Sequence, residues 1–369
     1  MTPCPPRTAK RCISLRGDAM GIYLGVSEIK KAFLSGTPLK QICLGAIPLL
    51  ATGPELVCVE AVTPLSPERF GLAAAAAGSC ALFGGGLSNS GVVAAVDAYD
   101  ASLTRTVPTP LSVARHFLTA AAVGEYVLFG GGATSSAIVD AYDASLTRTT
   151  PTALGVGRRL LAAARIGNYA LFGGGHSGSD SAAVDAYDGS LTRITPAALS
   201  EGRYALAAAT VGNYALFGGG LAGSAAASTV DAYDESLTRT SPAALSVGRY
   251  SFTAVSVENY ALFGGGNAYG PKSAAVDAYD ASLTRSTLTP LSRARNNLAS
   301  AAVGNFALFG GGETSAAVDA YDEALTRTVP APLSAARFDL AAATVGDYAL
   351  FGGGRGGPYS AAVDAYTIN

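Results

Sequence analysis

The stretch RYALAAATVGNYALFGGG, residues 203–220, decides the fold of this chain. It consists of an arginine, a run of small apolar residues, a Gly-Asn pair, a second apolar run and three glycines. A Gly-Asn pair between two apolar runs predicts a tight hairpin turn, because glycine adopts the positive φ that such a turn requires. Both runs are apolar on both faces, which predicts short strands of a sheet that is covered on both sides.

The same unit occurs seven times. Its triple glycine begins at Gly84, Gly130, Gly173, Gly218, Gly264, Gly310 and Gly352. An arginine, termed the repeat arginine, stands fifteen residues before each triple glycine, at Arg69, Arg115, Arg158, Arg203, Arg249, Arg295 and Arg337. A Val-Asp-Ala-Tyr segment follows and places the repeat aspartates, Asp97, Asp140, Asp185, Asp231, Asp277, Asp319 and Asp364. A sequence period of this length is typical of propellers and solenoids.

Each unit predicts four strands, termed a to d in chain order. Strand a is the Leu-Ala-Ala-Ala run, strand b is Tyr-Ala-Leu-Phe, strand c is Ala-Ala-Val-Asp-Ala-Tyr, and strand d is Leu-Thr-Arg-Thr, which a proline-rich corner ends. Radial stacking of four-stranded blades covers both faces of every sheet. The sequence therefore predicts an all-β fold, a seven-bladed β-propeller.

The ends of the repeat array favour a closed ring over an open solenoid, which would need atypical capping units. The seventh copy stops at Thr367-Ile368-Asn369, directly after its strand c. Residues 56–66 align with the segment of strand d that ends at residues 109–112. We expect this N-terminal strand to complete the last blade, so that the propeller covers residues 55–369 and has no open edge.

The repeat arginine, the triple glycine and the Asp and Tyr of strand c resemble the kelch motif. This resemblance implies a propeller similar to that of galactose oxidase. Kelch blades usually carry a Trp in strand d, where this chain has Leu103, Leu146, Leu191, Leu237, Leu283 and Leu325. Only two histidines occur, His116 and His176, so the copper centre of galactose oxidase cannot be assembled, and we expect no cofactor.

The segment before the propeller has a different pattern. Tyr23-Leu24-Gly25, Phe33-Leu34-Ser35-Gly36 and Cys43-Leu44-Gly45 recur every ten residues, which predicts a small β-meander over residues 20–54. The pattern is similar to the YLG-type repeats of phage and prophage tail-associated proteins. That similarity implies an attachment module for a phage-like assembly. Residues 1–19 fit no pattern, and we expect a disordered or non-native leader, with translation starting at Met20.

Composition excludes several partners and sites. The net charge is −2 and only 14% of the residues are charged, so we expect no binding of nucleic acid or of an anionic membrane. No apolar run approaches the ~20 residues of a membrane-spanning helix. No targeting route can be read from the N-terminal residues. The five cysteines show no CxxC spacing, and we expect no metal site.

The repeat aspartates and arginines predict a structural role. A short turn between strands c and d would place Asp97 opposite Arg105, and every complete copy repeats that pair. We therefore expect a charge pair inside each blade. The triple glycines lack the Gly-Lys-Ser/Thr of a phosphate-binding loop, and their sevenfold repetition favours a structural cause.

Variation between the copies falls on one face. The a–b and c–d turns hardly change, whereas the d–a and b–c connections differ in almost every copy. We expect the two residues after each repeat arginine to ring the mouth of a central channel, and the first of these positions holds Phe70, His116, Arg159, Tyr204, Tyr250, Asn296 and Phe338. The next position holds Gly71, Phe117, Leu160, Ala205, Ser251, Asn297 and Asp339. The b–c loops add Asn89, His176, Asp180, Asn267, Tyr269, Lys272, Glu313, Arg355 and Tyr359.

Aromatic and adaptable polar residues on one face are typical of recognition surfaces. The first hypothesis is a non-enzymatic binding or adhesion propeller for a surface glycan or protein. The second is a kelch-fold carbohydrate-active enzyme, of the epimerase or lyase type, with Asp339, Glu313, His116 and Arg159 as available groups. A structural spacer whose exposed loops have drifted is the third.

Overall fold

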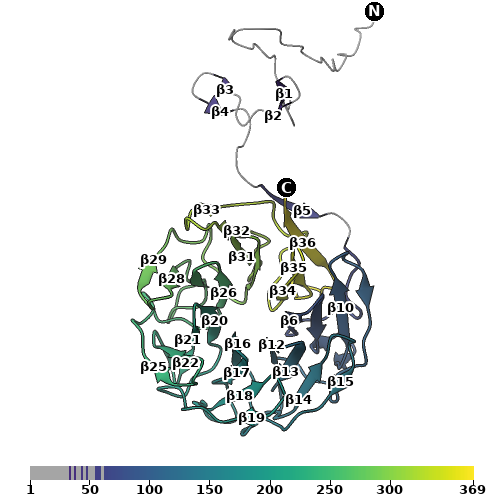
Figure 1. The fold of residues 1–369 in the computed structure, drawn as a ribbon, viewed down its shortest axis with the longest axis vertical. Helices are drawn as coiled ribbons and strands as arrows, with labels where there is room; N and C mark the ends of the chain where they lie inside the picture. The colour runs from purple at the N-terminus through teal and green to yellow at the C-terminus, as the bar shows by residue number, and fades with distance from the viewer. Residues whose placement is uncertain (1–32, 35–36, 39–42, 45–46, 49–54, 60–61) are drawn as a thin grey trace, which may run out of the picture. The chain divides into compact units, whose positions relative to one another are not determined.

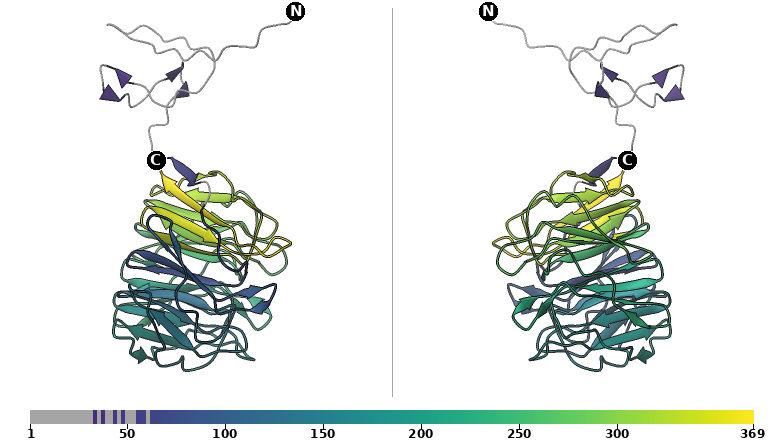
Figure 2. Two further views of the ribbon diagram at one scale, coloured as in Figure 1. Left: turned by 90° about the vertical axis from the view of Figure 1, so that its right-hand side faces the viewer. Right: turned by 90° about the vertical axis from the view of Figure 1, so that its left-hand side faces the viewer.

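The computed structural model describes residues 33–34, 37–38, 43–44, 47–48, 55–59 and 62–369. Leu56–Ile368 form one compact unit. It contains seven four-stranded antiparallel sheets arranged around a central axis, and the described residues contain no helix. Figure 1 shows the ring of blades, and Figure 2 shows the strands crossing the thickness of the disc. The predicted all-β, seven-bladed propeller is confirmed.

The blades are numbered in chain order, and the strands of each are given from inside to outside. Blades 1 to 3 are β6 (Ala73–Ala77), β7 (Cys80–Gly84), β10 (Val96–Asp100) and β11 (Arg105–Thr106); β12 (Thr119–Val123), β13 (Tyr126–Gly130), β14 (Val139–Tyr142) and β15 (Arg148–Thr149); and β16 (Ala162–Ile166), β17 (Tyr169–Gly173), β18 (Val184–Asp188) and β19 (Arg193–Ile194). Blades 4 and 5 are β20 (Ala207–Val211), β21 (Tyr214–Gly218), β24 (Val230–Tyr233) and β25 (Arg239–Thr240); and β26 (Thr253–Val257), β27 (Tyr260–Gly264), β28 (Val276–Asp280) and β29 (Arg285–Thr287). Blades 6 and 7 are β30 (Ala299–Val303), β31 (Phe306–Gly310), β32 (Val318–Tyr321) and β33 (Arg327–Thr328); and β34 (Ala341–Val345), β35 (Tyr348–Gly352), β36 (Val363–Ile368) and β5 (Leu56–Val59).

Four short strands lie in two b–c loops: β8 (Leu87–Ser88) pairs with β9 (Gly91–Val92), and β22 (Leu221–Ala222) pairs with β23 (Ala225–Ala226). Four more lie in the segment before the propeller. There β1 (Phe33–Leu34) pairs with β2 (Thr37–Pro38), and β3 (Cys43–Leu44) pairs with β4 (Ile47–Pro48). The rest of residues 20–54, and all of residues 1–19, lie outside the described residues, so the meander and the leader stay predictions.

The N-terminal strand completes the last blade, as the sequence predicts. β5 pairs antiparallel with β36, with Leu56 opposite Ile368 and Val59 opposite Ala365. In Figure 1 the purple β5 lies against the yellow β36. This strand is longer and more apolar than most of the outer strands, because Leu56 packs on the core between blades 6 and 7 and Val59 on the core between blades 7 and 1.

Each interface between neighbouring blades has its own apolar core. The Phe of strand b meets the Tyr of strand c edge to face, as Phe83 does with Tyr99 at 5.8 Å between ring centroids. The same Phe covers the first glycine of the preceding triple. A Cβ on Gly352 would lie 2.8 Å from the Phe83 ring, and all seven first glycines face such a ring. Packing against the next blade therefore explains the constant first glycine.

The turn between strands c and d differs from the prediction. Leu103 was predicted to lie in strand d, but it lies in the turn with φ +60°, and β11 holds only Arg105–Thr106. The Asp100 Oδ1 accepts hydrogen bonds from the backbone N–H groups of Ser102 and Thr104, both at 2.9 Å. The carboxylate therefore closes a compact turn, and Leu103 packs on the core between blades 7 and 1. The other five leucines have the same conformation: Leu146, Leu191, Leu237, Leu283 and Leu325.

Candidate binding site at the mouth of the central channel

The two variable connections of each blade meet on one face. The residue after the repeat arginine pairs its backbone with the first residue after the triple glycine, as Phe70 does with Leu87 and Phe338 with Arg355. In blades 2 and 6 a single hydrogen bond makes this link, from Ala133 N–H to the His116 carbonyl and from Glu313 N–H to the Asn296 carbonyl. The d–a and b–c connections are thus joined in every blade.

The next residue of each blade belongs to a closed ring of main-chain hydrogen bonds, termed the mouth ring. Its members are Gly71, Phe117, Leu160, Ala205, Ser251, Asn297 and Asp339. Each N–H donates to the carbonyl of the preceding member at 2.7 to 3.1 Å, and Gly71 N–H donates to Asp339 and closes the circle. All seven have positive φ, between +52° and +63°. The sequence predicted these seven residues at the mouth, but it did not indicate their hydrogen bonds or their positive φ.

The mouth ring lines a cavity of about 280 Å³ together with the next residue of each blade, which directly precedes the inner strand, and with Thr119. The ring residues fall into two arcs. Blades 1 to 4 contribute the apolar arc of Gly71, Phe117, Leu160 and Ala205, and blades 5 to 7 contribute the polar arc of Ser251, Asn297 and Asp339. The Phe117 ring covers Gly71, where a Cβ would lie 3.1 Å from it. The mouth is therefore apolar on one side and polar on the other.

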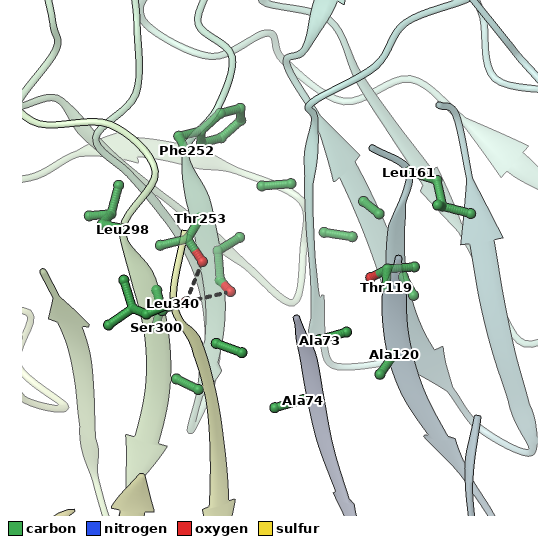
Figure 3. A pocket seen from close by; sticks show the side chains of 18 of the residues that line it. Ala73, Ala74, Thr119, Ala120, Leu161, Phe252, Thr253, Leu298, Ser300 and Leu340 are labelled. Atoms are coloured by element: carbon green, nitrogen blue, oxygen red, sulfur yellow. Dashed lines mark hydrogen bonds between the residues drawn. The ribbon is translucent and has the colours of Figure 1, made fainter. Parts of the chain in front are cut away.

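Below the mouth the channel continues between the inner strands. A second cavity of about 260 Å³ shares the apolar residues that follow the mouth ring and is otherwise lined by small residues. Strand a is the inner edge of every sheet, so its outward N–H and C=O groups have no partner in that sheet. Figure 3 shows Thr253 and Ser300 joined across neighbouring blades, with 2.7 Å between their hydroxyl oxygens. The wall of this second cavity is thus uncharged and presents backbone polar groups.

Of the two positions predicted to ring the mouth, the second forms the mouth ring, and the seven residues of the first lie beside it. None of them lines the cavity, because each pairs with its own b–c loop one residue before the mouth ring. Phe70 and Asn296 are buried, at 4% and 8% exposure. His116, Tyr204, Tyr250 and Phe338 are half-buried, and Arg159 is exposed.

The predicted residues of the b–c loops mostly contact each other or the neighbouring position. Asn89 donates to Glu68 at 3.0 Å, and Lys272 pairs with Glu313 at 2.8 Å. His176 lies 3.1 Å from Asp180 and packs near the Tyr204 ring. The backbone of Asn267 pairs with those of Tyr250 and Lys272, and Tyr269 is 76% exposed. Arg355 and Tyr359 lie against Phe70.

The repeat aspartates are structural and lie between two arginines. The predicted pair is present, since Arg105 Nη1 lies 2.7 Å from Asp97 Oδ1, although Tyr99 and not Asp97 stands directly opposite Arg105. The repeat arginine Arg69 binds the other carboxylate oxygen at 2.7 Å, a contact that the sequence analysis missed. The shared constancy of the two residues in all seven copies was the available signal.

The other blades repeat this arrangement with small changes. Each of the remaining repeat arginines binds the repeat aspartate of its own blade at 2.5 to 2.8 Å. In blade 2 the outer contact, between Arg148 and Asp140, is 3.7 Å. In blade 7 the closing strand has Cys58 opposite Tyr366, in the place of the outer arginine. Burial would raise the pKa of Asp277, but the charge and hydrogen bonds of Arg249 and Arg285 outweigh it and lower that pKa.

Two titratable groups near the mouth are shifted. Burial raises the pKa of Asp339, with Arg355 opposing and Glu313 adding to the shift. Burial lowers the pKa of His116, and the charge of Arg159 adds to that shift. Of the four groups named for an enzyme, only Asp339 lines the cavity. Within residues 55–59 and 62–369, no three His, Cys, Asp or Glu side chains gather as a metal site, and no helix suited to spanning a membrane was found in the described parts of the chain.

Comparison with known proteins supports the architecture. The solved structure of YjhT is similar to this chain, with a TM-score of 0.56 at 12% sequence identity, over 84% of this chain and 99% of YjhT. No family model matches the chain, and no curated protein matches it either. At this identity the likeness shows a shared propeller fold and nothing finer.

Proposed function

We propose that the propeller binds a small hydroxyl-rich ligand, a saccharide residue of a surface glycan, at the mouth ring. The observation that carries this proposal is the variety of side chains at seven backbone-equivalent positions. The seven positions hold seven different residues in one left-handed conformation. Six of them are not glycine.

Drift in exposed loops would give a different outcome. A left-handed conformation costs a residue other than glycine about 1 kcal/mol, with Asn and Asp the least affected. Drift at such a position therefore favours Gly, Asn and Asp. Phe117, Leu160 and Ala205 keep the costly conformation although their hydrogen bonds in the ring use only main-chain groups.

The c–d turns provide an internal comparison. Leu103 and its five equivalents have the same positive φ, and there the residue is Leu in every copy because it packs between blades. Backbone strain is therefore compatible with a constant residue where the side chain faces the core. At the mouth the same strain accompanies a different side chain in every blade, and the common property is that these residues line a cavity.

The chemistry of the two arcs suits a sugar ring. A saccharide presents hydroxyl groups at its edges and C–H groups on its faces. Asp339, Asn297 and Ser251 supply carboxylate, amide and hydroxyl partners, and Phe117 and Leu160 supply apolar surface. A cavity of about 280 Å³ is at the lower end of ligand sites, which favours a single residue at a time.

A glycan array tests the proposal with the intact chain and the double variant Asn297→Gly/Asp339→Gly. Glycine keeps the left-handed conformation, so the variant removes two side chains and leaves the backbone of the ring in place. We expect the wild-type chain to bind a defined set of glycans and the variant to lose at least tenfold in affinity. The control is Tyr269→Ala, at an exposed loop tip, which should bind like the wild type. Equal binding by the double variant would refute the mouth as the site.

An enzyme is the second candidate, because one observation favours it. Asp339 lines the cavity, and burial raises its pKa above the ordinary value, as general acids often require. Incubation of any bound glycan with the chain, followed by NMR spectroscopy of the sugar, tests this candidate. Release or conversion of the sugar that Asp339→Asn abolishes would support it, and unchanged sugar would exclude turnover of that glycan.

The attachment of residues 20–54 to a phage-like assembly stays a prediction from the sequence. Pull-down with a fusion of those residues to an unrelated carrier would test it.

A further inference from the structure

Arg355, in the b–c loop of blade 7, is held between two aromatic rings. Its guanidinium carbon lies 4.2 Å from the centroid of the Phe70 ring and 4.6 Å from that of the Phe338 ring. The backbone of Arg355 exchanges two hydrogen bonds with Phe338, both at 2.9 Å. Tyr359 packs against the Phe70 ring at 4.9 Å between centroids. Both the backbone and the side chain of Arg355 are therefore fixed.

The fixed guanidinium points to the mouth ring. Arg355 Nη2 lies 3.1 Å from Asp339 Oδ2, and Asp339 lines the cavity. Among the described residues, Arg355 is the only arginine paired with a member of the mouth ring. The arrangement also spans the seam between blades 7 and 1, since Phe70 belongs to blade 1.

These contacts give Phe70 and Phe338 a role other than touching a ligand. Phe70 is almost completely buried, so it cannot form much contact with a bound molecule. Two rings within 5 Å of a guanidinium stabilise its charge and restrict its orientation. The aromatic residues after the repeat arginines in blades 1 and 7 thus hold the Arg355 guanidinium, which contacts Asp339 at the cavity.

The electrostatic surroundings of Asp339 make this support necessary. Burial disfavours the ionised carboxylate, and the nearby Glu313 disfavours it further. Glu313 is itself paired with Lys272 at 2.8 Å. Arg355 is the group that opposes both effects by its charge and its hydrogen bond. Loss of Arg355 would leave a half-buried acid near another acid.

We propose that Arg355 is a positioning residue that keeps the Asp339 carboxylate ionised and oriented at the mouth, clamped in place by Phe70 and Phe338. An ionised carboxylate only accepts hydrogen bonds, so the mouth selects ligands that present hydroxyl or amine donors on the side of blade 7. This inference rests on the proposed function for its consequence, but the effect of Arg355 on Asp339 does not depend on any ligand.

The test is a pH titration of the aspartate side chains by NMR spectroscopy, with ¹³C at Cγ. The Asp339 signal is assigned by its disappearance in Asp339→Asn. In Arg355→Met we expect the midpoint of Asp339 to rise by about one pH unit, a tenfold gain in proton affinity. Arg355→Lys keeps the charge and loses the planar group, so its midpoint should lie between the two. Phe70→Leu should raise the midpoint in the same direction by a smaller amount.

Arg165→Met is the matched control, because it removes the same charge from an exposed arginine of strand β16, which lines the far part of the channel. Its Asp339 midpoint should equal that of the wild type. An unchanged midpoint in Arg355→Met would overturn the proposal. If Arg355→Met does not fold, an unchanged midpoint in both Arg355→Lys and Phe70→Leu would do so. A residue that only stabilises the seam would lower stability without moving this titration.

A second measurement separates this inference from the proposed function. On the same glycan array, as the pH is lowered, Arg355→Met should lose binding at a higher pH than the wild type does, because its Asp339 binds a proton at a higher pH. A raised midpoint with no glycan bound by the wild type would leave Arg355 as a positioning residue and refute the saccharide ligand. Glycan binding that is unaffected by Arg355→Met would refute the role of Arg355 in specificity.

Discussion

At the scale of single residues, the same backbone strain serves two purposes in this propeller. Leu160 in the mouth ring and Leu146 in a c–d turn have φ values of +55° and +62°. Leu160 lines the cavity, whereas Leu146 packs on the core between blades 1 and 2. The two leucines therefore allow strain and side-chain contact to be separated by experiment.

Leu160→Gly and Leu146→Gly should differ in stability. Both changes relieve about 1 kcal/mol of backbone strain. Leu146→Gly also removes a packed side chain, so we expect a net loss of about 2 kcal/mol in the free energy of unfolding by urea. Leu160→Gly should leave that free energy within about 0.5 kcal/mol of the wild type. A loss at Leu160 as large as that at Leu146 would show that the mouth residue is part of the core.

The repeat aspartates make the stability of the propeller depend on pH. Asp277 has a lowered pKa in the folded chain, so its ionised form stabilises the fold above the ordinary pKa of aspartate, and that contribution is lost as the pH falls through the lowered value. Asp277→Asn should cost about 3 kcal/mol at pH 7, because it leaves Arg249 buried beside a neutral group. The difference from the wild type should shrink below about pH 4.

Urea unfolding at several pH values measures this difference. Glu235→Gln changes an exposed side chain by the same chemistry and should follow the wild type at every pH. A difference between Asp277→Asn and the wild type that stays constant down to pH 3 would contradict the lowered pKa.

At the scale of elements, the sequence predicted the inner strands well and the outer strand poorly. Strands a and b are apolar runs bounded by two-residue turns, which begin with Gly in six of the seven blades, and by triple glycines, and these local signals agree with the tertiary structure. Strand d was predicted to begin at the Leu, but Asp100 closes the turn through two backbone N–H groups and places Leu103 outside the ladder. The residue pattern Asp-x-Ser-Leu does not reveal that the Leu has a positive φ, since Leu rarely adopts it.

The closing strand β5 is the element on which the ring depends. Val59 and Thr106 occupy equivalent positions, since Val59 stands opposite Ala365 in blade 7 and Thr106 stands opposite Ala98 in blade 1. Val59 packs on a core, whereas Thr106 is exposed. Val59→Asp should lower the midpoint of thermal unfolding by about 5 °C and speed proteolysis before blade 1. Thr106→Asp, at the equivalent place, should have little effect on either. Equal effects of the two changes would mean that β5 is no more important than any outer strand.

At the scale of the whole molecule, the number and order of the blades were predictable because seven copies carry the same pattern. The closure of the ring was predictable because the strand missing from the last copy is found at the other end of the array. The hydrogen bonds and the backbone conformation of the mouth ring were not predictable. Six of the ring's hydrogen bonds join residues about 45 positions apart, and the seventh joins Gly71 to Asp339 at the other end of the array. The conformation of the ring opposes the local preference of Phe117, Leu160 and Ala205. Only the approach of all seven inner strands to one axis imposes that conformation. The sequence placed both residues after each repeat arginine at the mouth, and the structure brings only the second of them to the cavity.

Hydrogen exchange tests whether the mouth ring behaves as a unit. We expect the seven ring amides to be protected to a similar degree, within about tenfold, because opening any one of them requires two blades to separate. In Val59→Asp the Gly71 amide should lose protection first, since its hydrogen bond to Asp339 crosses the seam that β5 closes. Mass spectrometry with single-residue resolution measures both effects. Unprotected ring amides in the wild type would contradict a stable ring.

The mouth ring also has a consequence for protein engineering. Because its hydrogen bonds use only main-chain groups, each blade accepts a new side chain at the mouth without any change in the path of the chain. A library randomised at the seven ring positions would vary the lining of a single cavity while the interfaces between blades keep their wild-type sequence. The same property would let a natural lineage acquire a new ligand through substitutions made in one blade at a time.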